Sequence, residues 1–240
     1  MEFSDIHSHI LFNTDDGPKS KEEMFSLIDK IYEEGIRHLC LTSHFHPGYY
    51  GNNTSKKNQA YETLLEYTSK KYPDLYLYSG NELHYSPDCV SWLHEGLCHT
   101  LNHSRYVLVD FPHRTAYKEV QNGLKSLLSA GYIPVLAHAE RYRISKKQVI
   151  SLKQLGVLIQ LNAQAILGKS GWFEKIKTQK ILSKHLADFV ATDTHDITYR
   201  PPNLKNCYQY LQKRYGKSYA DHLCLNHALT LILKNYSGRK

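Results

Sequence analysis

The sequence predicts an α/β fold in one domain over residues 1–240, with a mainly parallel sheet. Three observations lead to this prediction. Apolar, β-rich segments alternate with helical patterns along the whole chain. No Pro/Gly-rich linker, low-complexity tract or obvious internal repeat interrupts the alternation. Seven βα-like units in 240 residues fit a closed, TIM-like barrel better than an open sheet.

Seven segments have the composition of buried strands. In chain order they are Phe3–Ile6, His38–Thr42, Leu75–Ser79, Tyr106–Phe111, Ile133–Ala137, Val157–Leu161 and Phe189–Thr192. Between them, apolar residues at i, i+3, i+4 and i+7 predict helices that stop at Gly35 and Gly131. The predicted helices cover 24–31, 56–71, 120–128, 146–155 and 220–233.

The hydrophobic fraction of 41% is sufficient for a substantial core. No apolar run approaches the roughly 18 residues that would span a bilayer. The N-terminus, MEFSDI, has no basic region followed by an apolar stretch, so it does not read as a secretory signal. We therefore expect a cytoplasmic protein without membrane insertion.

The cysteines and the charge exclude two classes of function. No CxxC spacing occurs, and no cysteine is followed six positions later by arginine, which excludes the Cys-x5-Arg loop of thiol-based phosphatases. The net charge of +7 suggests anionic partners such as phosphates or acidic peptides. However, the lysines are scattered over predicted helix surfaces, and no motif for nucleic-acid recognition is present, so we expect no nucleic-acid partner.

Two histidines, His7 and His9, stand one residue apart at the end of the first predicted strand. In a strand, residues i and i+2 point to the same face, so both imidazoles would project together. Two neutral imidazoles that converge on one point form half of a metal site. A pair of histidines on a solvated strand face is the alternative, and the other strand ends must decide between the two.

Six of the seven predicted strands end in His, Asp or Glu, at the barrel end that carries the chemistry in such folds. The candidates are His7, His9 and Asp16 after the first strand, His44 after the second, Glu82 after the third, Asp110 at the end of the fourth, His138 and Arg141 after the fifth, and Asp193, His195 and Arg200 after the seventh. Acidic groups and imidazoles that converge on one rim need cations between them. The mixed N/O set without thiolate favours Zn, Mn or Fe, and its size implies two or three ions.

These motifs resemble the PHP (polymerase and histidinol phosphatase) superfamily. The motifs are His7-x-His9, Asp16-Gly17, Thr42-Ser43-His44, Gly80-Asn81-Glu82, Asp110-Phe111-Pro112, residues 136–142 (LAHAERY) and Asp193-Thr194-His195 followed by Arg200-Pro201. Within the superfamily, the segments AHAERY, DDGPKS and RPP are similar to those of the manganese-dependent protein-tyrosine phosphatases of bacterial capsule and exopolysaccharide clusters, the CpsB/YwqE type. The resemblance runs from residue 3 to about 205 and continues weakly into the last helix.

The resemblance implies a distorted (β/α)7 barrel with three divalent ions, with Mn preferred and Zn or Fe as alternatives. By motif, His7, His9 and Asp193 would hold one ion, and Glu82 would bridge to a second one that Asp110 and His138 complete. Asp16, His44 and His195 would hold the third ion. Arg141 and Arg200 would bind the phosphoryl group and act in catalysis. The implied substrate is a phosphotyrosine protein, the tail of a bacterial tyrosine autokinase of polysaccharide assembly.

Two departures from the family pattern stand out. The fourth strand usually ends in Glu-Phe, whereas Asp110-Phe111 stands here, so the carboxylate is one methylene shorter and the second ion would be bound less tightly or through water. The family's AHPERY is AHAERY here, and Ala139 in place of proline loses some rigidity in the loop that carries Arg141.

Alternatives remain open at this stage. The same site would suit a phosphoesterase for histidinol phosphate or another small phosphomonoester. A barrel that binds metal or phosphopeptides without turnover is a third interpretation. Several nearby residues are expected more often as loop or substrate contacts than as ligands: Asp15, His46, His84, His113 and Glu140. Phe45, Tyr49 and Tyr50 are candidates to stack on a phosphotyrosine ring, and ordinary, partly buried aromatic residues are an equally good interpretation of them.

Overall fold

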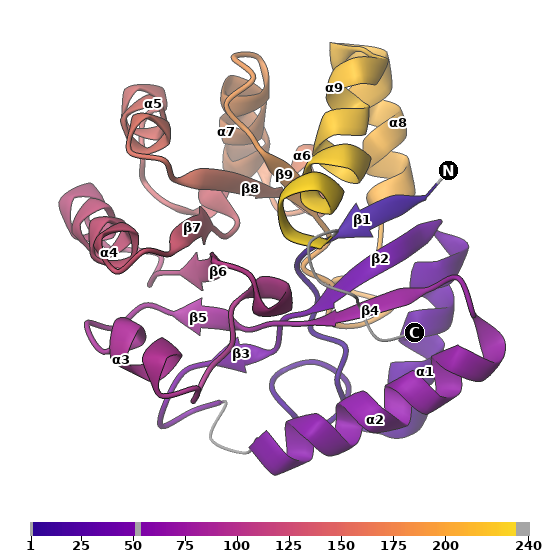
Figure 1. Ribbon diagram of the computed structural model, residues 1–240. Coiled ribbons are helices and arrows are strands. Elements are labelled where there is room, and N and C mark those ends of the chain that lie inside the picture. Colours follow the sequence, from indigo (N-terminus) through magenta and orange to yellow (C-terminus); the bar gives the residue numbers. More distant parts are fainter. Residues whose placement is uncertain (1, 51–53, 234–240) are drawn as a thin grey trace.

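The computed structural model describes residues 2–50 and 54–233, with the strands at the centre and helices around them (Figure 1). The seven predicted strands are present, and their ends lie within two residues of the prediction. They are β1 (Phe3–Asp5), β2 (Ile36–Leu41), β4 (Tyr76–Ser79), β6 (Tyr106–Asp110), β7 (Ile133–Leu136), β8 (Leu158–Asn162) and β9 (Phe189–Ala191). Every paired neighbour runs parallel.

Two further short strands, β3 (His44–Phe45) and β5 (Glu82–His84), continue the lines of β2 and β4 after a break that the sequence did not predict. The break divides the strands into β1-β2-β4 and β3-β5-β6-β7-β8-β9. Backbone hydrogen bonds still cross it, because Thr42 N–H donates to the carbonyl oxygen of Ser8 (2.9 Å) and Glu82 N–H donates to that of Thr42 (3.2 Å). The two sheets therefore form one curled wall.

The wall closes where the chain leaves β1 and β9. A parallel bridge joins Ser8 to Thr194. Asp193 N–H donates to the carbonyl oxygen of His7 (3.0 Å), and His9 N–H donates to that of Thr194 (2.9 Å). The barrel thus closes at the carboxyl ends of its strands, and the predicted barrel-like α/β fold is confirmed.

Most of the helices cover the outside of this wall. The longer ones are α1 (Lys21–Glu33), α2 (Thr54–Lys71), α4 (Tyr117–Ser129), α5 (Lys146–Gln154), α7 (Trp172–Leu182) and α8 (Leu204–Tyr215), and the shorter ones are α3 (Cys89–His94), α6 (Ala163–Ile166), η1 (Leu101–His103) and η2 (Ala139–Arg141). The sequence patterns missed α7 and α8. Helix α7 buries only Thr178, Ile181 and Leu182, so its apolar periodicity is weak. Among the described residues, no helix is long and apolar enough to cross a membrane.

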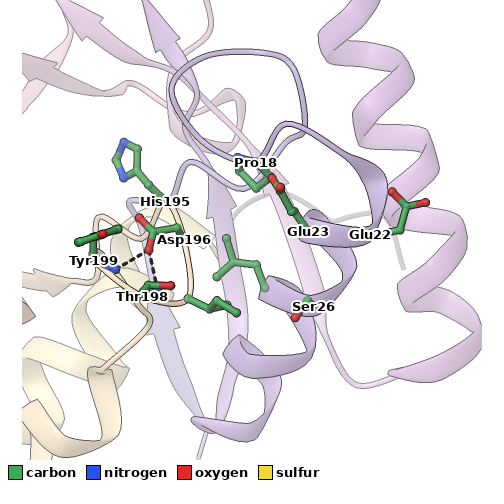
Figure 2. A pocket seen from close by; sticks show the side chains of 10 residues that line it. Pro18, Glu22, Glu23, Ser26, His195, Asp196, Thr198 and Tyr199 are labelled. Atoms are coloured by element: carbon green, nitrogen blue, oxygen red, sulfur yellow. Dashed lines mark hydrogen bonds between the residues drawn. The ribbon is translucent and has the colours of Figure 1, made fainter.

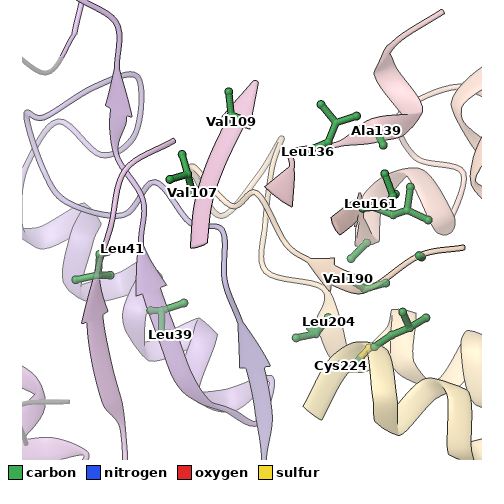
Figure 3. Packing of buried hydrophobic residues seen from close by; sticks show 14 of the residues in the cluster. Leu39, Leu41, Val107, Val109, Leu136, Ala139, Leu161, Val190, Leu204 and Cys224 are labelled. Carbon is green, nitrogen blue, oxygen red and sulfur yellow. The ribbon is translucent and has the colours of Figure 1, made fainter. Parts of the chain in front are cut away.

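The buried hydrophobic residues form two layers. The larger layer lies between the strands and the surrounding helices and includes Leu39 and Leu41 of β2 and Val107 and Val109 of β6 (Figure 3). Because side chains alternate along a strand, the residues between these positions point to the barrel interior. Cys40 and Leu108 accordingly belong to a second, inner cluster.

The C-terminal segment fills the interior beneath the strand ends. Instead of the single helix predicted at 220–233, the chain forms α9 (Lys217–Asp221) and the π-helical turns η3 (His222–Asn226) and η4 (Leu229–Leu233). Ile232 packs in the inner cluster, and its carbonyl oxygen accepts a hydrogen bond from the Asn102 side chain (3.0 Å). The lower barrel is therefore a packed, mainly apolar core, and the cluster of charged and imidazole side chains lies at its upper end.

Candidate metal centre

The side chains that follow the barrel strands meet at one end of the barrel. The ligand atoms of eight predicted residues form three overlapping groups in which the atoms lie within 4.8 Å of one another. The groups are His7, His9 and Glu82; Glu82, Asp110 and His138; and His9, Asp16, His44 and His195. The ninth residue, Asp193, adjoins the first group. All nine side chains meet as the strand-end pattern predicts, and their binding of metal stays a prediction.

The first group is the tightest. His7 Nε2 lies 3.0 Å from His9 Nε2, 3.3 Å from Glu82 Oε2 and 3.4 Å from Asp193 Oδ1. His9 Nε2 lies 3.2 Å from Glu82 Oε2 and 3.6 Å from Asp193 Oδ1. Four ligands at about 2.1 Å around one tetrahedral ion would be separated by about 3.4 Å. The distances from the two imidazole nitrogens therefore match the spacing of ligands around one metal ion.

The other two groups share residues with the first. Glu82 turns its second oxygen, Oε1, to His138 Nε2 at 2.7 Å, so its carboxylate faces two groups at once. In the third group, Asp16 Oδ1 lies 3.1 Å from His195 Nε2 and 3.5 Å from His44 Nε2. His9 also belongs to this group, and its ring stacks on that of His195 at 4.0 Å. Glu82 lies between the two groups, and its role as a bridging ligand stays a prediction.

The Asp15-Asp16-Gly17 turn holds the third group in place. Asp15 Oδ2 accepts hydrogen bonds from His9 Nδ1 (2.8 Å) and from the backbone N–H of His44 (2.9 Å). Asp15 therefore orients two candidate ligands from behind, which is the usual role of a carboxylate around metal-bound histidine. A Cβ at residue 17 would collide with the carbonyl oxygen of His9, so this turn requires glycine.

Strand β8 supplies a supporting layer that the sequence pattern did not reveal. Gln160 Oε1 accepts hydrogen bonds from His7 Nδ1 (3.2 Å) and from the backbone N–H of His138 (2.8 Å). Gln160 Nε2 donates to Asn162 Oδ1 (2.7 Å), and Asn162 Nδ2 donates to Asp193 Oδ2 (2.8 Å). With Nδ1 of His7 bound in this way, its Nε2 lone pair points to the centre. Amides at a strand end carry no charge signal, so only spatial proximity identifies them.

The electrostatics of the centre favour cations. Burial lowers the pKa of His7, but the carboxylates of Glu82 and Asp193 overcome this and raise the pKa to about 9. Burial likewise lowers the pKa of His44, and Glu82 raises it to about 10. Burial raises the pKa of Asp193, yet His7 and Arg141 hold it well below its ordinary value. The carboxylates thus stay ionised and attract positive charge, which metal ions would supply in place of protons.

Three buried side-chain atoms in this centre have no hydrogen-bond partner: Asp16 Oδ1, Glu82 Oε2 and His138 Nδ1. They are distributed over all three groups. Glu82 is completely buried, and an unsatisfied buried carboxylate oxygen costs several kcal/mol. Divalent cations would satisfy such atoms, so the residues present fit a polynuclear metal site.

Two of the candidate ligands adopt left-handed backbone conformations. The φ angle is 32° at His138 and 53° at Asp193. Such a conformation in a non-glycine residue costs about 1–3 kcal/mol and often marks a functional site. Here it turns the chain at the ends of β7 and β9, where both side chains join the centre.

Two arginines reach the centre from different groups. Arg141 Nη2 donates to Asp193 Oδ2 at 2.6 Å, and Arg200 Nη2 donates to Asp16 Oδ2 at 2.8 Å. Arg200 Nη1 also lies 2.8 Å from His195 Nε2. Both side chains remain about one-third exposed, at 30% and 34%, so a ligand above the centre can reach them.

The neighbouring residues have several different roles. Glu140 is buried, with its pKa raised by burial to about 7, and its carboxylate accepts a hydrogen bond from the Asn162 backbone. The rings of His46 and His84 stack on each other at 4.1 Å at the rim. His113 lies on the exposed surface after β6.

Phe45 was wrongly proposed to stack on substrate, because it is only 4% exposed and packs against Trp92. Tyr49 is exposed, whereas the Tyr50 ring stands 5.7 Å from that of His44.

A cleft of about 600 Å³ opens beside the centre (Figure 2). One wall comes from the start of α1, with Glu22 and Glu23, and the other from the loop after His195. Asp196 closes that loop by accepting backbone hydrogen bonds from Thr198 and Tyr199. No Lys or Arg is among the residues that the structure shows lining the cleft, so its fixed charges are acidic.

The barrel and its strand-end cluster define a metal-dependent hydrolase of the TIM-barrel-like class. Solved structures of low identity share this fold, such as the phosphotriesterase homology protein from Escherichia coli (TM-score 0.64, 10% identity, 96% of this chain and 98% of that one). The chain belongs to the family described as capsular polysaccharide synthesis, CpsB/CapC, whose model matches residues 3–233. The family resemblance seen in the sequence is therefore confirmed.

Relatives that are named tyrosine-protein phosphatases align with nearly the whole chain. The tyrosine-protein phosphatase CpsB of Streptococcus pneumoniae is 33% identical over 237 residues, which are 95% of this chain and 98% of the relative. The tyrosine-protein phosphatase YwqE of Bacillus subtilis is 26% identical over 234 residues, with coverages of 96% and 91%. A crystal structure reported for YwqE and CpsB as unique metal-dependent tyrosine phosphatases matches with a TM-score of 0.88, 26% identity and coverages of 99% and 96%.

Proposed function

We propose that this chain is a metal-dependent protein-tyrosine phosphatase that acts in capsular or exopolysaccharide synthesis. The observation that carries the proposal is the convergence of five imidazoles and four carboxylates between two partly exposed arginines. Full-length similarity to tyrosine-protein phosphatases of the CpsB/CapC family supports it.

The nine residues would hold up to three divalent ions, with Mn preferred and Zn or Fe as alternatives. The first ion would be held by His7, His9, Glu82 and Asp193. The second would be held by Glu82, Asp110 and His138. The third would be held by Asp16, His44 and His195, which lie beside His9. When bound, such ions supply a nucleophilic water near neutral pH and neutralise charge on the phosphoryl oxygens.

The protein's own groups bind and orient the phosphoryl group. Arg141 and Arg200 each present a planar fork of N–H donors, which matches phosphate oxygens in a bidentate manner. They approach the centre from opposite groups, through Asp193 and Asp16 respectively, so together they fix the ester between them. The phenolate of tyrosine, with a pKa near 10, leaves with little help from an acid, which suits a site without a dedicated proton donor.

The cleft beside His195 supports a polypeptide substrate over a small phosphomonoester. Its volume of about 600 Å³ exceeds what the phosphoryl group needs, and it is continuous with the centre through His195. Ile197 and Tyr199 expose 55% and 82% of their surfaces at its edge. Because Glu22, Glu23 and Asp196 are among the residues that line this cleft, a basic residue next to the phosphotyrosine is the side chain it fits best.

Reversing the charge of the cleft should change peptide preference. In Glu22→Lys we expect kcat/KM for a lysine-flanked phosphotyrosine peptide to fall about 5-fold relative to a glutamate-flanked one, the size expected for exposed charge pairs. Hydrolysis of p-nitrophenyl phosphate should not change, since that substrate does not enter the cleft. Glu33→Lys, at the far end of the same helix, is the matched control. Equal effects on both peptides would exclude the cleft as a peptide site.

The partner that we propose is the phosphotyrosine tail of a bacterial tyrosine autokinase. The family's description in capsular polysaccharide synthesis supports this assignment. A cytoplasmic location is consistent with the five cysteines, because all of them are buried and unpaired (Cys40, Cys89, Cys98, Cys207 and Cys224).

The deciding experiment uses protein stripped with a chelator. Mn, Zn, Fe or Mg is added back, and hydrolysis of a phosphotyrosine peptide, a phosphoserine peptide and histidinol phosphate is compared. Metal-dependent turnover that prefers the aryl ester is the expected result. Turnover of histidinol phosphate alone would keep the site and change the function, and no turnover with any metal would favour a binding module without catalysis.

A further inference from the structure

The adjacent strands β3, β5 and β6 carry polar side chains up to the mouth of the barrel, beside the metal centre. The register pairs His44 of β3 with Glu82 of β5, and His84 of β5 with Asp110 of β6. Since residues i and i+2 share a strand face, Glu82 and His84 point to the same side, with His84 one step nearer to the rim. His84 and Asp110 are thus direct cross-strand neighbours at the mouth of the barrel.

His84 holds the carboxylate of Asp110. Its Nδ1 lies 3.1 Å from Asp110 Oδ1 and 3.2 Å from Oδ2, so the ring nitrogen faces both oxygens. Among the described residues, no other side chain makes a recorded hydrogen bond to this carboxylate. The Asp110 side chain is 15% exposed, and that of His84 is 23% exposed. Without His84, the carboxylate would be free to turn towards solvent.

The His84 ring is itself braced. It stacks on the His46 ring at 4.1 Å with an interplanar angle of 27°. The backbone next to it is fixed to β6, because Tyr85 N–H donates to the carbonyl oxygen of Asp110 at 2.9 Å. His46 in turn is held by reciprocal backbone hydrogen bonds with Tyr50. The imidazole is therefore a rigid support for a side chain that has two free torsions.

Two other carboxylates of the centre have a comparable support. Asp193 accepts hydrogen bonds from Asn162 and Arg141, and Asp16 accepts one from Arg200. Partners of this kind orient metal ligands, and their loss typically lowers metal affinity about 10–100-fold. Asp110 is the shortest-reaching ligand of its group, because aspartate lacks one methylene of glutamate. It therefore depends on such a partner more than a glutamate would.

We propose that His84 is a positioning residue for the second metal ion. Its Nδ1–H bond directs the Asp110 carboxylate to the ion shared with Glu82 and His138, which compensates for the short side chain. This inference rests on the proposed metal-dependent function. It adds a residue that acts through Asp110 and makes no contact with substrate.

The test measures metal occupancy and affinity in His84→Phe, which keeps an aromatic ring against His46 but has no N–H. We expect the weakest-bound ion to lose about 10–100-fold in affinity. Metal analysis after dialysis should then show fewer ions per chain than in the wild type, with the remainder retained. Adding Asp110→Glu to this variant should restore occupancy, because the longer carboxylate reaches the ion without support. His46→Phe keeps the ring stack and the Asp110 bond and is the matched control.

Full occupancy and affinity in His84→Phe would overturn the inference. Loss of all ions together would also overturn it, since that result indicates a damaged fold rather than one misplaced ligand. Failure of Asp110→Glu to restore the ion would show that His84 acts by some route other than Asp110. If the wild-type protein binds no divalent ion and hydrolyses no phosphotyrosine, the proposed function fails and this inference fails with it. If the wild type binds metal and hydrolyses phosphotyrosine but His84→Phe keeps full occupancy and affinity, only this inference fails.

Discussion

His7→Ala should lower kcat/KM for a phosphotyrosine peptide by more than about 10³-fold. Residues that only support metal ligands typically contribute 10–100-fold, and His7 stands among the ligands themselves. Its Nε2 lies within 3.4 Å of three other candidate ligand atoms, from His9, Glu82 and Asp193. Without it, the tightest group would lose one of two imidazoles, and its two carboxylates would face each other across an incomplete shell. Steady-state kinetics with saturating Mn and metal analysis of the dialysed protein measure both effects.

His38→Ala provides the control for His7→Ala. His38 is a partly buried histidine on β2, and its Nδ1 bonds to the Tyr78 hydroxyl, outside the metal centre. It should keep its metal content and lose little activity. Circular dichroism should show a folded protein in both variants. Substantial activity in His7→Ala, with its metal retained, would contradict the assignment of the first group.

The sequence could predict the barrel and the residues that meet at its end because both depend on local patterns. Alternating strands and helices determine a parallel sheet, and the carboxyl ends of parallel strands meet at one edge. A charged or imidazole side chain directly after a buried strand is therefore placed without any knowledge of distant contacts. His44, Glu82 and Asp193 were found in this way although they lie far apart in the chain.

The supporting layer could not be predicted, because it depends on which strands become neighbours in space. Gln160 on β8 bonds to His7 on the chain after β1 and to the backbone of His138, residues 153 and 22 positions away. A glutamine in an apolar strand has no chemical signature that separates it from an ordinary polar residue. The break between β2 and β3 was missed for a similar reason, since the backbone of Thr42 and Ser43 bonds there to Ser8 and Glu82, which are distant in the chain.

The C-terminal segment shows how burial can override periodicity. Apolar residues between 220 and 233 predicted a regular helix, but the chain forms π-helical turns that direct Ala228 and Ile232 into the inner cluster. The C-terminal segment must fit the shape of the barrel interior, and the free energy gained from close packing outweighs the less favourable geometry of the π-helical turns. Because this segment fills the lower interior, the polar groups of the centre gather at the upper end of the barrel.

Arg141→Ala should reduce kcat/KM for phosphotyrosine by about 10²–10³-fold while leaving the metal content unchanged, the range for removal of one preorganised donor to developing charge. The separation follows from the contacts of Asp193. Its Oδ2 loses the 2.6 Å bond from Arg141 but keeps the 2.8 Å bond from Asn162, and its Oδ1 still faces His7 and His9. The candidate ligand thus stays in place although the phosphoryl-binding group is gone.

Two comparisons make the result specific to the guanidinium. Arg141→Lys should recover little activity, because an ammonium group cannot form the two parallel bonds of the arginine fork. Arg143→Ala, two residues further along and exposed, should behave as wild type. Inorganic phosphate should also inhibit Arg141→Ala more weakly, since product and substrate share the same oxygens. Loss of metal in Arg141→Ala would instead show that Arg141 mainly holds Asp193, and the phosphoryl-binding role would then pass to Arg200 alone.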